Sequence, residues 1–411
     1  MFTGITVELA DDLKLRWSRL QKRVREAGAD ALVIGTNVNL FYVSGKVFMG
    51  HAYIPAEGAP CFFVRRPCGL AVGADPCVRP GHTHGCAPTD VRVFDVRKVE
   101  QIPEILQDIG APLPKKVLIE DDDLSHSDWV RLAAVFGNNV VGGGSAVLRQ
   151  CRATKTPYEV RVMKLTGARQ SEVFPRYASV YEPGMTDGQW ATEMFRMMLN
   201  AGGLGHFRIA GSTMEGFMGT ILAGDNGGAV SPYDFALGGA GFHPSLPVGQ
   251  CGVRLAKGMS VMVDIPGIFY GYITDCTRVF GVGKLAQKAY DAHQLSIDIR
   301  GAIMEAGKPG VRCEDLYNLA LKMADDAGFA DCFMGGAQKA KFVGHGTGIV
   351  INELPVLGAR SKDILEEGMT VALEPKFVIP GTGAVGVEDT LVVTPNGMEN
   401  LTPCAPEITT L

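Results

Sequence analysis

Two stretches of this sequence place a pair of acidic residues inside runs that are typical of β-strands. In "GMSVMVDIPGIFYGYITDCTRVF" the acids are Asp264 and Asp275, and in "VALEPKFVIPGTGAVGVEDTLVV" they are Glu374 and Glu388. A hairpin that turns at the Phe-Tyr dipeptide of the first stretch would oppose its two aspartates directly, with Cβ atoms about 4.5–5.5 Å apart. A second hairpin, turning near Gly381, would oppose the two glutamates in the same way.

Carboxylates opposed in this way repel each other unless a cation lies between them, so the two hairpins together predict a metal centre. His345, in "VGHGTGIVINELP", offers a nitrogen ligand. Oxygen ligands with one imidazole suit Mn²⁺, Fe²⁺, Co²⁺ or Zn²⁺. A two-metal site additionally needs shared carboxylates and ions about 3.5–4 Å apart. The alternative is that the acids are solvated positions on half-exposed strands.

The first part of the chain alternates predicted helices and strands, which is typical of an open α/β domain. Residues 5–27 form an amphipathic pattern that ends at Gly28, a residue favoured just after a helix. The further strand candidates are "DALVIG", "CFFVRR" and "KVLIE", and the further helix candidates are "VEQIPEILQDIG" and "HSDWVRLAAVFGNN".

The glycine-rich stretch "GNNVVGGGSAV" predicts a boundary between one domain of residues 1–150 and a second of residues 151–411. The second domain begins with two helix-start signals. Thr156 with Glu159, and Thr186 with Gln189, each have the spacing of a capping box, in which the two side chains bond each other's backbone N–H groups. Strands are expected after about residue 205.

Composition excludes several classes of function. The chain has 411 residues and a net charge of -5, so no excess of basic residues argues for nucleic acid or an anionic membrane. The N-terminus has no apolar signal segment, and no apolar run reaches the length of a membrane span. A cytoplasmic location is therefore predicted.

Two other motifs are weaker. The cluster "CVRPGHTHGC", with Cys68 nearby, could hold zinc, but its spacing matches no compact zinc finger, and a loop with reduced thiols is the plainer interpretation. "GTGAVG" matches the glycine fingerprint of dinucleotide-binding folds, yet the strand-like "VEDTLVV" follows it where that fold needs a helix. A hairpin turn is predicted there.

The order Asp264, Asp275, His345, Glu374, Glu388 resembles the ligand set of the pita-bread metallopeptidases, the group that includes methionine aminopeptidase, aminopeptidase P, prolidase and creatinase. Ahead of it, "GADALVIGTNVNLFYVSG" is similar to the opening of the creatinase-type N-terminal domain, and "RATKTPYEVRVMK" to the linker and first catalytic helix. The resemblance implies an α/β N-terminal creatinase-like domain followed by an α+β pita-bread catalytic domain.

The resemblance also implies a reaction. Two divalent ions, with manganese favoured over cobalt, iron or zinc, would activate a water that attacks an amide carbonyl. Glu374 would be both a ligand and the acceptor of the water's proton. The substrate would be a short peptide that loses its N-terminal residue, often before proline, as in an Xaa-Pro dipeptidase or aminopeptidase. A homodimer is implied as well.

Four positions depart from the pattern of these relatives. Asn352 stands where they carry a second histidine, Val248 where a histidine precedes the glycine, and Val356 and Gly386 where they carry arginines. An asparagine can donate a hydrogen bond but cannot supply a proton. The residues that could serve in catalysis beside Glu374 are Asn352, His243 and His206. The candidates for substrate binding are Arg208 and Arg360, with Tyr233 and Asp234 weaker.

Three hypotheses follow. The first is a metal-dependent hydrolase of the Xaa-Pro dipeptidase or aminopeptidase P type. The second is a pita-bread enzyme acting on a small non-peptide amide or related C–N substrate, which the four departures favour. The third is a peptide-binding module without catalysis, which the complete ligand set disfavours.

Overall fold

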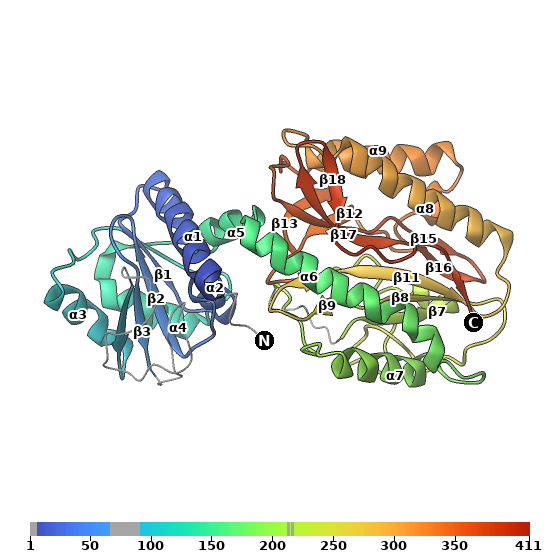
Figure 1. The fold of residues 1–411 in the computed structure, drawn as a ribbon, viewed down its shortest axis with the longest axis horizontal. Coiled ribbons are helices and arrows are strands. Elements are labelled where there is room, and N and C mark those ends of the chain that lie inside the picture. The colour runs from blue at the N-terminus through green and yellow to red at the C-terminus, as the bar shows by residue number, and fades with distance from the viewer. Residues whose placement is uncertain (1–5, 66–90, 212–213, 215–217) are drawn as a thin grey trace. The chain divides into compact units, whose positions relative to one another are not determined.

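A computed structural model describes residues 6–65, 91–211, 214 and 218–411. The chain divides into two compact units, Met1–Arg152 and Ala153–Leu411, each considered by itself (Figure 1). The cysteine and histidine cluster between Cys68 and Cys86 lies outside the described residues.

The N-terminal unit is built on one mixed six-stranded sheet in the order β4-β3-β2-β1-β5-β6. The central strand β1 pairs antiparallel with β2 and parallel with β5, so strands of both directions meet in one sheet. The strands are β1 (Ala31–Ile34), β2 (Gly50–Pro55), β3 (Cys61–Val64), β4 (Arg92–Asp95), β5 (Val117–Ile119) and β6 (Val140–Val141). The helices are α1 (Thr6–Glu26), α2 (Asn37–Ser44), α3 (Ile102–Asp108), α4 (His126–Phe136) and α5 (Gly144–Ala153).

Successive side chains of β3 pack against helices on both faces of this sheet. The ring of Phe62 contacts Trp17 of α1, while the next residue, Phe63, packs into the core that includes Leu106 of α3 and Leu132 of α4. Successive side chains of a strand point to opposite faces. The sheet therefore lies between helices, as the alternating pattern in the sequence predicted.

The C-terminal unit is built on a curved nine-stranded sheet. Seven strands follow the order β13-β12-β14-β17-β11-β8-β7, with β18 added beside β17 and β19 beside β11. The strands are β7 (Thr220–Ala223), β8 (Ser260–Asp264), β11 (Cys276–Gly281), β12 (Phe342–Gly346), β13 (Glu353–Gly358), β14 (Thr370–Leu373), β17 (Glu388–Thr394), β18 (Gly397–Asn400) and β19 (Thr409–Thr410). Two short pairs complete the unit: β9 (Gly267–Ile268) with β10 (Ile273–Thr274), and β15 (Lys376–Ile379) with β16 (Gly383–Gly386).

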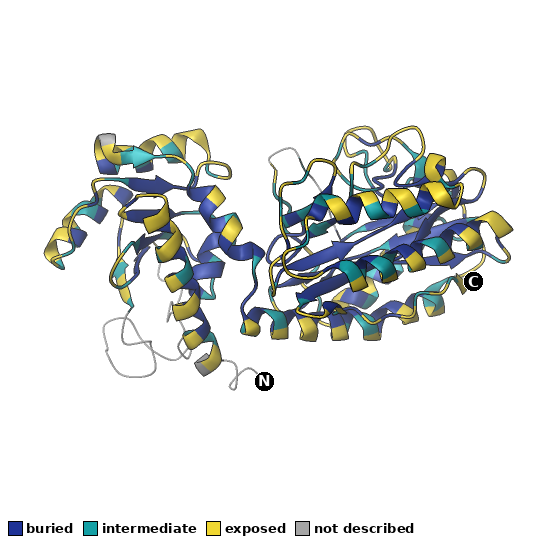
Figure 2. Ribbon diagram, turned by 90° about the horizontal axis from the view of Figure 1, so that it is seen from above, coloured by how far each residue is buried: buried dark blue, intermediate teal, exposed yellow. Residues whose placement is uncertain are grey.

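Helices cover this sheet from two sides (Figure 1). Val371 and Leu391, on neighbouring strands, pack in one core with residues of α8 (Gln287–Ala306) and α9 (Cys313–Asp326). Val261 of β8 packs in a second core with Trp190 of α7 (Asp187–Asn200). The strands are accordingly buried almost throughout, while the helices alternate between buried and exposed positions (Figure 2).

The two helix starts predicted from the sequence are confirmed. Thr156 caps α6 (Pro157–Val173) by accepting a hydrogen bond from the backbone of Glu159, whose carboxylate accepts one from Thr156 in return. Thr186 and Gln189 make the same reciprocal pair at α7. The hairpin predicted at "GTGAVG" is also confirmed, because β15 and β16 pair antiparallel around it. No helix in the described part of the chain is long and apolar enough to cross a bilayer.

Two helical glycines make a matched test of the packing of α6. A Cβ on Gly167 would clash with the backbone carbonyl of Leu401, whereas a Cβ on Gly301 of α8 would meet nothing within 4 Å. We expect Gly301→Ala to raise the free energy of unfolding by about 0.5–1 kcal/mol, the usual gain from removing a helical glycine. Gly167→Ala should lower it by about 1–3 kcal/mol, as overpacking does. Urea denaturation of both variants measures the difference, and equal stability would contradict the close approach of α6 to Leu401.

Candidate metal centre

Asp264 and Asp275 come together on one face of the sheet, but they are not directly opposed as predicted. Asp264 pairs with Thr277, because the hairpin turns one residue later than the Phe-Tyr dipeptide and the register moves by two. A shift of two keeps side chains on their original face, whereas a shift of one would have reversed it. The predicted opposition is wrong, and the shared face is retained.

The second hairpin has the register expected from its sequence. Leu373 pairs with Asp389, and Lys376 with Gly386, so Glu374 and Glu388 occupy the predicted facing positions between these pairs. Strand β17 also pairs with β11, where Glu388 is opposite Thr277. Because Thr277 is the cross-strand partner of both Asp264 and Glu388, it brings the acids of the two hairpins together.

His345 completes the cluster from the neighbouring strand β12, where it pairs with Ala372 of β14. Its Nδ1 lies 3.0 Å from the carbonyl oxygen of Gly346. A carbonyl only accepts, so Nδ1 carries the hydrogen, and Nε2 is left with a free lone pair. Nε2 lies 3.5 Å from Oε1 of Glu374.

The glycines beside His345 let other segments approach closely. A Cβ on Gly346 would clash with the carbonyl of Leu354 in the adjacent strand. A Cβ on Gly348 would lie 2.8 Å from Oε2 of Glu353. That carboxylate is buried and accepts hydrogen bonds from Lys155 and from the backbone after His345, including the N–H of Ile349. The ion pair therefore holds the loop that follows the histidine.

All five predicted metal ligands therefore converge. They fall into two overlapping groups whose ligand atoms lie within 4.8 Å of one another. One group is Asp275, His345 and Glu388, and the other is Asp264, Glu374 and Glu388. Since Glu388 belongs to both, it has the position of a shared ligand between two cation sites.

Lys376, which the sequence reasoning missed, lies among these carboxylates. Its ammonium donates hydrogen bonds to Asp264 at 2.9 Å, to Glu374 at 2.6 Å and to Glu388 at 2.9 Å. The lysine side chain is 1% exposed. A signal was present in the sequence: Lys376 follows Glu374 by two residues in a strand-like run, which is the spacing of side chains on one face.

The buried charges perturb one another. Burial raises the pKa of Asp275 well above its usual range, and the negative charges of Glu388 and Asp264 raise it further. Burial alone would lower the pKa of Lys376, but the carboxylates of Asp264, Glu374 and Glu388 raise it well above its ordinary value. The cluster is thus short of positive charge on the side of Asp275.

One carboxylate oxygen of the cluster has no hydrogen-bond partner among the described residues. Glu388 Oε2 accepts hydrogen bonds from Lys376 and from Thr277, whereas Oε1 is buried and has no hydrogen-bond partner among the described residues. A buried carboxylate oxygen without a partner is costly. Together with Nε2 of His345 and the carboxylate of Asp275, this atom fits a divalent ion of the kind predicted from the sequence.

A second set of charges fixes the strand that carries Glu388. The next residue, Asp389, is fully buried and forms ion pairs with Arg278 of β11 and Arg300 of α8. Arg278 also donates to the backbone carbonyl of Glu388 at 2.8 Å. These contacts lock β17 to β11 and hold Glu388 in the shared position.

Asn352 is engaged with the backbone of a distant segment. Its Oδ1 accepts from the N–H of Ala210 at 2.7 Å, and its Nδ2 donates to the carbonyl of Ala210 at 3.0 Å. The carbonyl of Arg208 in turn accepts from the N–H of Ile351. The segment "HFRIA" is therefore attached to the loop that follows His345.

The other predicted residues lie outside the two ligand groups. The Arg208 side chain is partly buried, and burial lowers its pKa. His206 is exposed, and His243 is exposed in a loop where its Nδ1 contacts the Ser245 hydroxyl at 2.8 Å. Arg360 is also exposed. None of these four belongs to the two ligand groups formed by the described residues.

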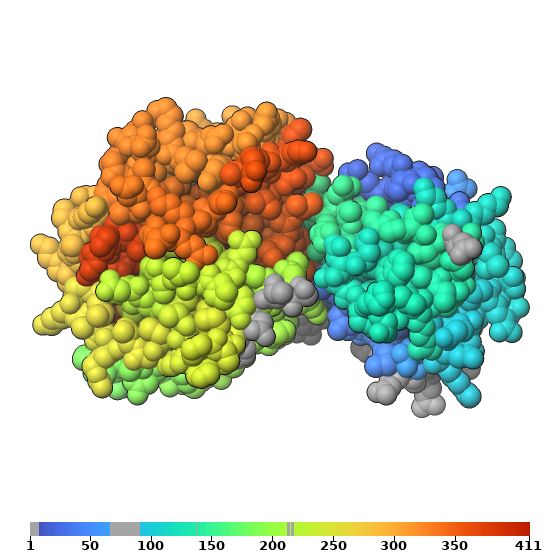
Figure 3. Space-filling view, turned by 180° about the vertical axis from the view of Figure 1, so that it is seen from behind, coloured from blue at the N-terminus to red at the C-terminus, as the bar shows by residue number. Residues whose placement is uncertain are grey.

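A pocket of about 440 Å³ adjoins the strands that carry His345. Its lining residues lie within three segments, 228–238, 335–342 and 356–361. On the surface in Figure 3 the region of the first segment borders that of the other two. Val356 is the cross-strand partner of His345, and the Phe342 ring contacts the His345 ring edge-on at a centroid distance of 6.1 Å. Both Val356 and Phe342 line the pocket, so the imidazole lies next to its wall.

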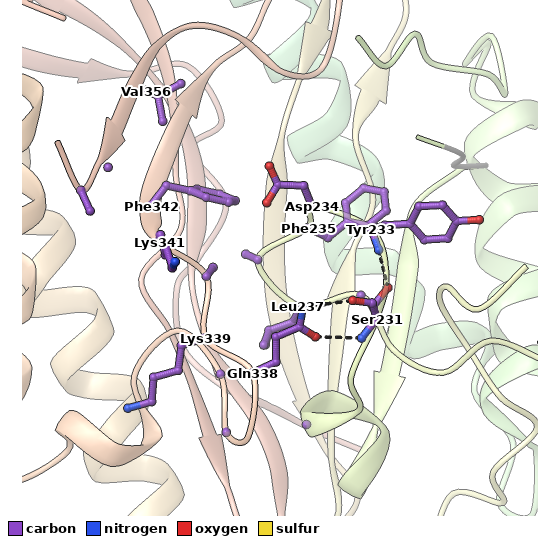
Figure 4. Close-up of a pocket in the computed structure, with 18 of the residues that line it drawn as sticks. Ser231, Tyr233, Asp234, Phe235, Leu237, Gln338, Lys339, Lys341, Phe342 and Val356 are labelled. Atoms are coloured by element: carbon purple, nitrogen blue, oxygen red, sulfur yellow. Dashed lines mark hydrogen bonds between the residues drawn. The ribbon is translucent and has the colours of Figure 1, made fainter. Parts of the chain in front are cut away.

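Figure 4 shows how the two walls are joined. Gln338 accepts a hydrogen bond from the N–H of Ser231 and donates one to its carbonyl, each at 3.0 Å. Asp234 and Phe342 point toward each other from opposite walls, while Lys339 is turned away and donates to the carbonyl of Ala330. Arg360 also lines the pocket, and so do the weaker candidates Tyr233 and Asp234.

Comparison with known proteins identifies the family. The model of the creatinase/prolidase N-terminal domain matches residues 16–154, and that of metallopeptidase family M24 matches residues 161–395. The Xaa-Pro dipeptidase of Pyrococcus furiosus is 23% identical, over 96% of this chain and 100% of that protein.

Solved structures share the fold over the whole length. The Xaa-Pro dipeptidase from Bacillus anthracis superposes with a TM-score of 0.77 at 21% identity, covering 97% of this chain and 100% of that one. The X-Pro aminopeptidase from Thermotoga maritima gives 0.74 at 19% identity, covering 96% and 99%. The predicted creatinase-like domain followed by a pita-bread domain is confirmed, and the chain belongs to metallopeptidase family M24.

Proposed function

We propose that this protein is a metal-dependent hydrolase that removes the N-terminal residue from short Xaa-Pro peptides. The observation that carries the proposal is the convergence of His345 and four carboxylates. A pocket of about 440 Å³ is lined by Phe342 and Val356, the neighbours of His345. Membership of a metallopeptidase family, and similarity to Xaa-Pro dipeptidases, support the reaction class. Hydrolysis of an amide at neutral pH needs an activated water molecule. A bound divalent ion would activate the water by lowering the pKa of that water.

The protein's own residues have separable roles in this proposal. His345, with Nδ1 engaged by the Gly346 carbonyl, presents Nε2 to the ion. Glu388 presents its unpaired Oε1, and Asp275 adds a carboxylate. Glu374 would accept the proton of the attacking water at Oε1, because Oε2 is already bonded by Lys376. Phe342 and Val356 line the pocket and neighbour His345, so they would form an apolar wall for a bound substrate.

One observation favours the second candidate, a small non-peptide amide or related C–N compound. Both the oxygen and the nitrogen of the Asn352 amide are hydrogen-bonded to the backbone of Ala210. From the resemblance, a catalytic histidine was expected at this position. The neighbouring wall position is the apolar Val356, where an arginine was expected from the resemblance. These two positions provide no charge for a dipeptide's carboxylate.

Several finer points stay predictions. Manganese is favoured over cobalt, iron and zinc as the ion. Catalytic roles for Asn352, His243 and His206, a binding role for Arg208, a homodimeric assembly and a cytoplasmic location also stay predictions, and each needs its own measurement.

Metal removal tests the reaction class. Protein treated with a chelator should lose hydrolysis of Ala-Pro and Ala-Pro-Pro, and added Mn²⁺ or Co²⁺ should restore it, because the activated water depends on the ion. His345→Ala should not recover under the same conditions. Release of proline and alanine is followed by chromatography. Turnover of small amides with no cleavage of any metal-loaded peptide would replace the first candidate with the second.

Arg360 offers a test of how a peptide carboxylate is held. Arg360→Met should raise KM for Ala-Pro about tenfold with little change in kcat, since a hydrogen bond to a charged group contributes about 1.5–3 kcal/mol. Lys339→Met is the matched control, because that lysine also lines the pocket but its ammonium bonds the Ala330 carbonyl. Equal effects of the two substitutions on KM would exclude a specific role for Arg360.

A further inference from the structure

The Lys376 ammonium has the contacts of a bound cation. Its three bonds go to Asp264, Glu374 and Glu388, which together are one of the two ligand groups of the centre. An ammonium has three protons to donate, so these bonds saturate it. The other ligand group has no bond from this lysine to Asp275 or His345, and Oε1 of Glu388 has no hydrogen-bond partner among the described residues.

A metal ion and this ammonium cannot share the first group. Bonds from carboxylate oxygens to a transition metal are about 2.0–2.2 Å long, so an ion held by the same three oxygens would lie where Nζ lies. The two positive charges would also repel strongly at that separation in a buried site. The lysine side chain is 1% exposed, so its ammonium is withdrawn from solvent.

The carboxylates of the cluster outnumber its only ammonium among the described residues, so the cluster still attracts a cation. The cluster holds four carboxylates, those of Asp264, Asp275, Glu374 and Glu388, and the ammonium of Lys376 bonds all of them except Asp275. The excess negative charge is concentrated on the side of Asp275 and the unpaired Glu388 oxygen, where His345 supplies a nitrogen ligand. A divalent ion at that position restores most of the balance.

Strand pairing explains how the lysine reaches this place. Lys376 and Gly386 are cross-strand partners at the start of the β15–β16 pair. Gly386 has φ of 142°, and a Cβ on it would lie 3.0 Å from the Cα of Lys376. A side chain at position 386, such as the arginine expected there from the resemblance, is therefore disfavoured. The positive charge on this pair of strands comes from Lys376, on the opposite strand.

We propose that Lys376 is a built-in cation that replaces one metal ion, so that the chain binds one divalent ion, at Asp275, His345 and Glu388, in place of the two predicted from the sequence. The inference deepens the proposed function and rests on it for the use of the ion in hydrolysis. The number of ions can be counted without any substrate.

Metal binding by the full chain tests the proposal. Chelator-treated protein is titrated with Mn²⁺ by calorimetry, its metal content is measured by mass spectrometry, and its electron paramagnetic resonance spectrum is recorded. We expect one ion per chain with the hyperfine pattern of an isolated Mn²⁺. Lys376→Ala should bind two ions and give the spectrum of a coupled pair, because removal of the ammonium frees Asp264, Glu374 and Glu388.

Two further variants protect the test from effects on folding. Lys339→Met removes a lysine whose ammonium bonds the Ala330 carbonyl and that belongs to neither ligand group, and this variant should still bind one ion. Lys376→Met keeps most of the side-chain volume without the charge, and its circular dichroism shows whether the fold survives. Two coupled ions or none in the unmodified protein would overturn the proposal, and so would a single ion in Lys376→Ala.

These outcomes are separate from the outcome for the reaction. A count of one ion together with no cleavage of Xaa-Pro peptides contradicts the proposed function and leaves the role of Lys376 intact. Cleavage of those peptides by a protein with two ions supports the proposed function and contradicts the role of Lys376.

Discussion

The structure places several carboxylates within an apolar sheet, and their negative charge has to be balanced by positive charge nearby. Burial raises the pKa of Asp264, Asp275 and Glu388, so holding them ionised together requires positive charge at close range. The chain supplies part of that charge itself, through Lys376. Isolated carboxylates in such a place would otherwise take up protons or weaken the fold.

Other buried acids around the centre form ion pairs with basic side chains. Asp389 is balanced by Arg278 and Arg300, and Glu353 by Lys155. Removing one partner of a buried pair leaves an uncompensated charge and is strongly destabilising. The ion pairs therefore hold the strands and loops that carry the ligands, while Oε1 of Glu388 has no hydrogen-bond partner among the described residues. That division leaves only the Asp275 side of the centre short of positive charge.

Much of this could be predicted from the sequence, because the signals are local. The capping boxes at Thr156 and Thr186 involve residues three positions apart, and the register of the second hairpin follows from the turn at Gly381. The first hairpin was displaced by two residues because its turn includes Gly271, whose positive φ of 81° suits a turn one residue later than the Phe-Tyr dipeptide. The even shift is why its carboxylates still converge.

Other features depend on contacts between distant segments. Asn352 and Ala210 are far apart in the chain, so nothing near Asn352 indicated that its amide would bond that backbone. Lys376 was overlooked for a different reason: the ligand residues were identified by type, and a lysine is not a metal ligand in its charged form. Counting the cations on the same strand face as the acids would have found it.

The covalent attachment of Lys376 has a consequence for how the centre behaves in a cell. A metal ion dissociates, is taken by chelators and exchanges with competing metals, whereas an ammonium on the polypeptide does none of these. Asp264, Glu374 and Glu388 are therefore organised as soon as the chain has folded, whatever the metal supply. A protein built in this way needs to capture only one ion, and one third of the positive charge at the centre is part of the polypeptide.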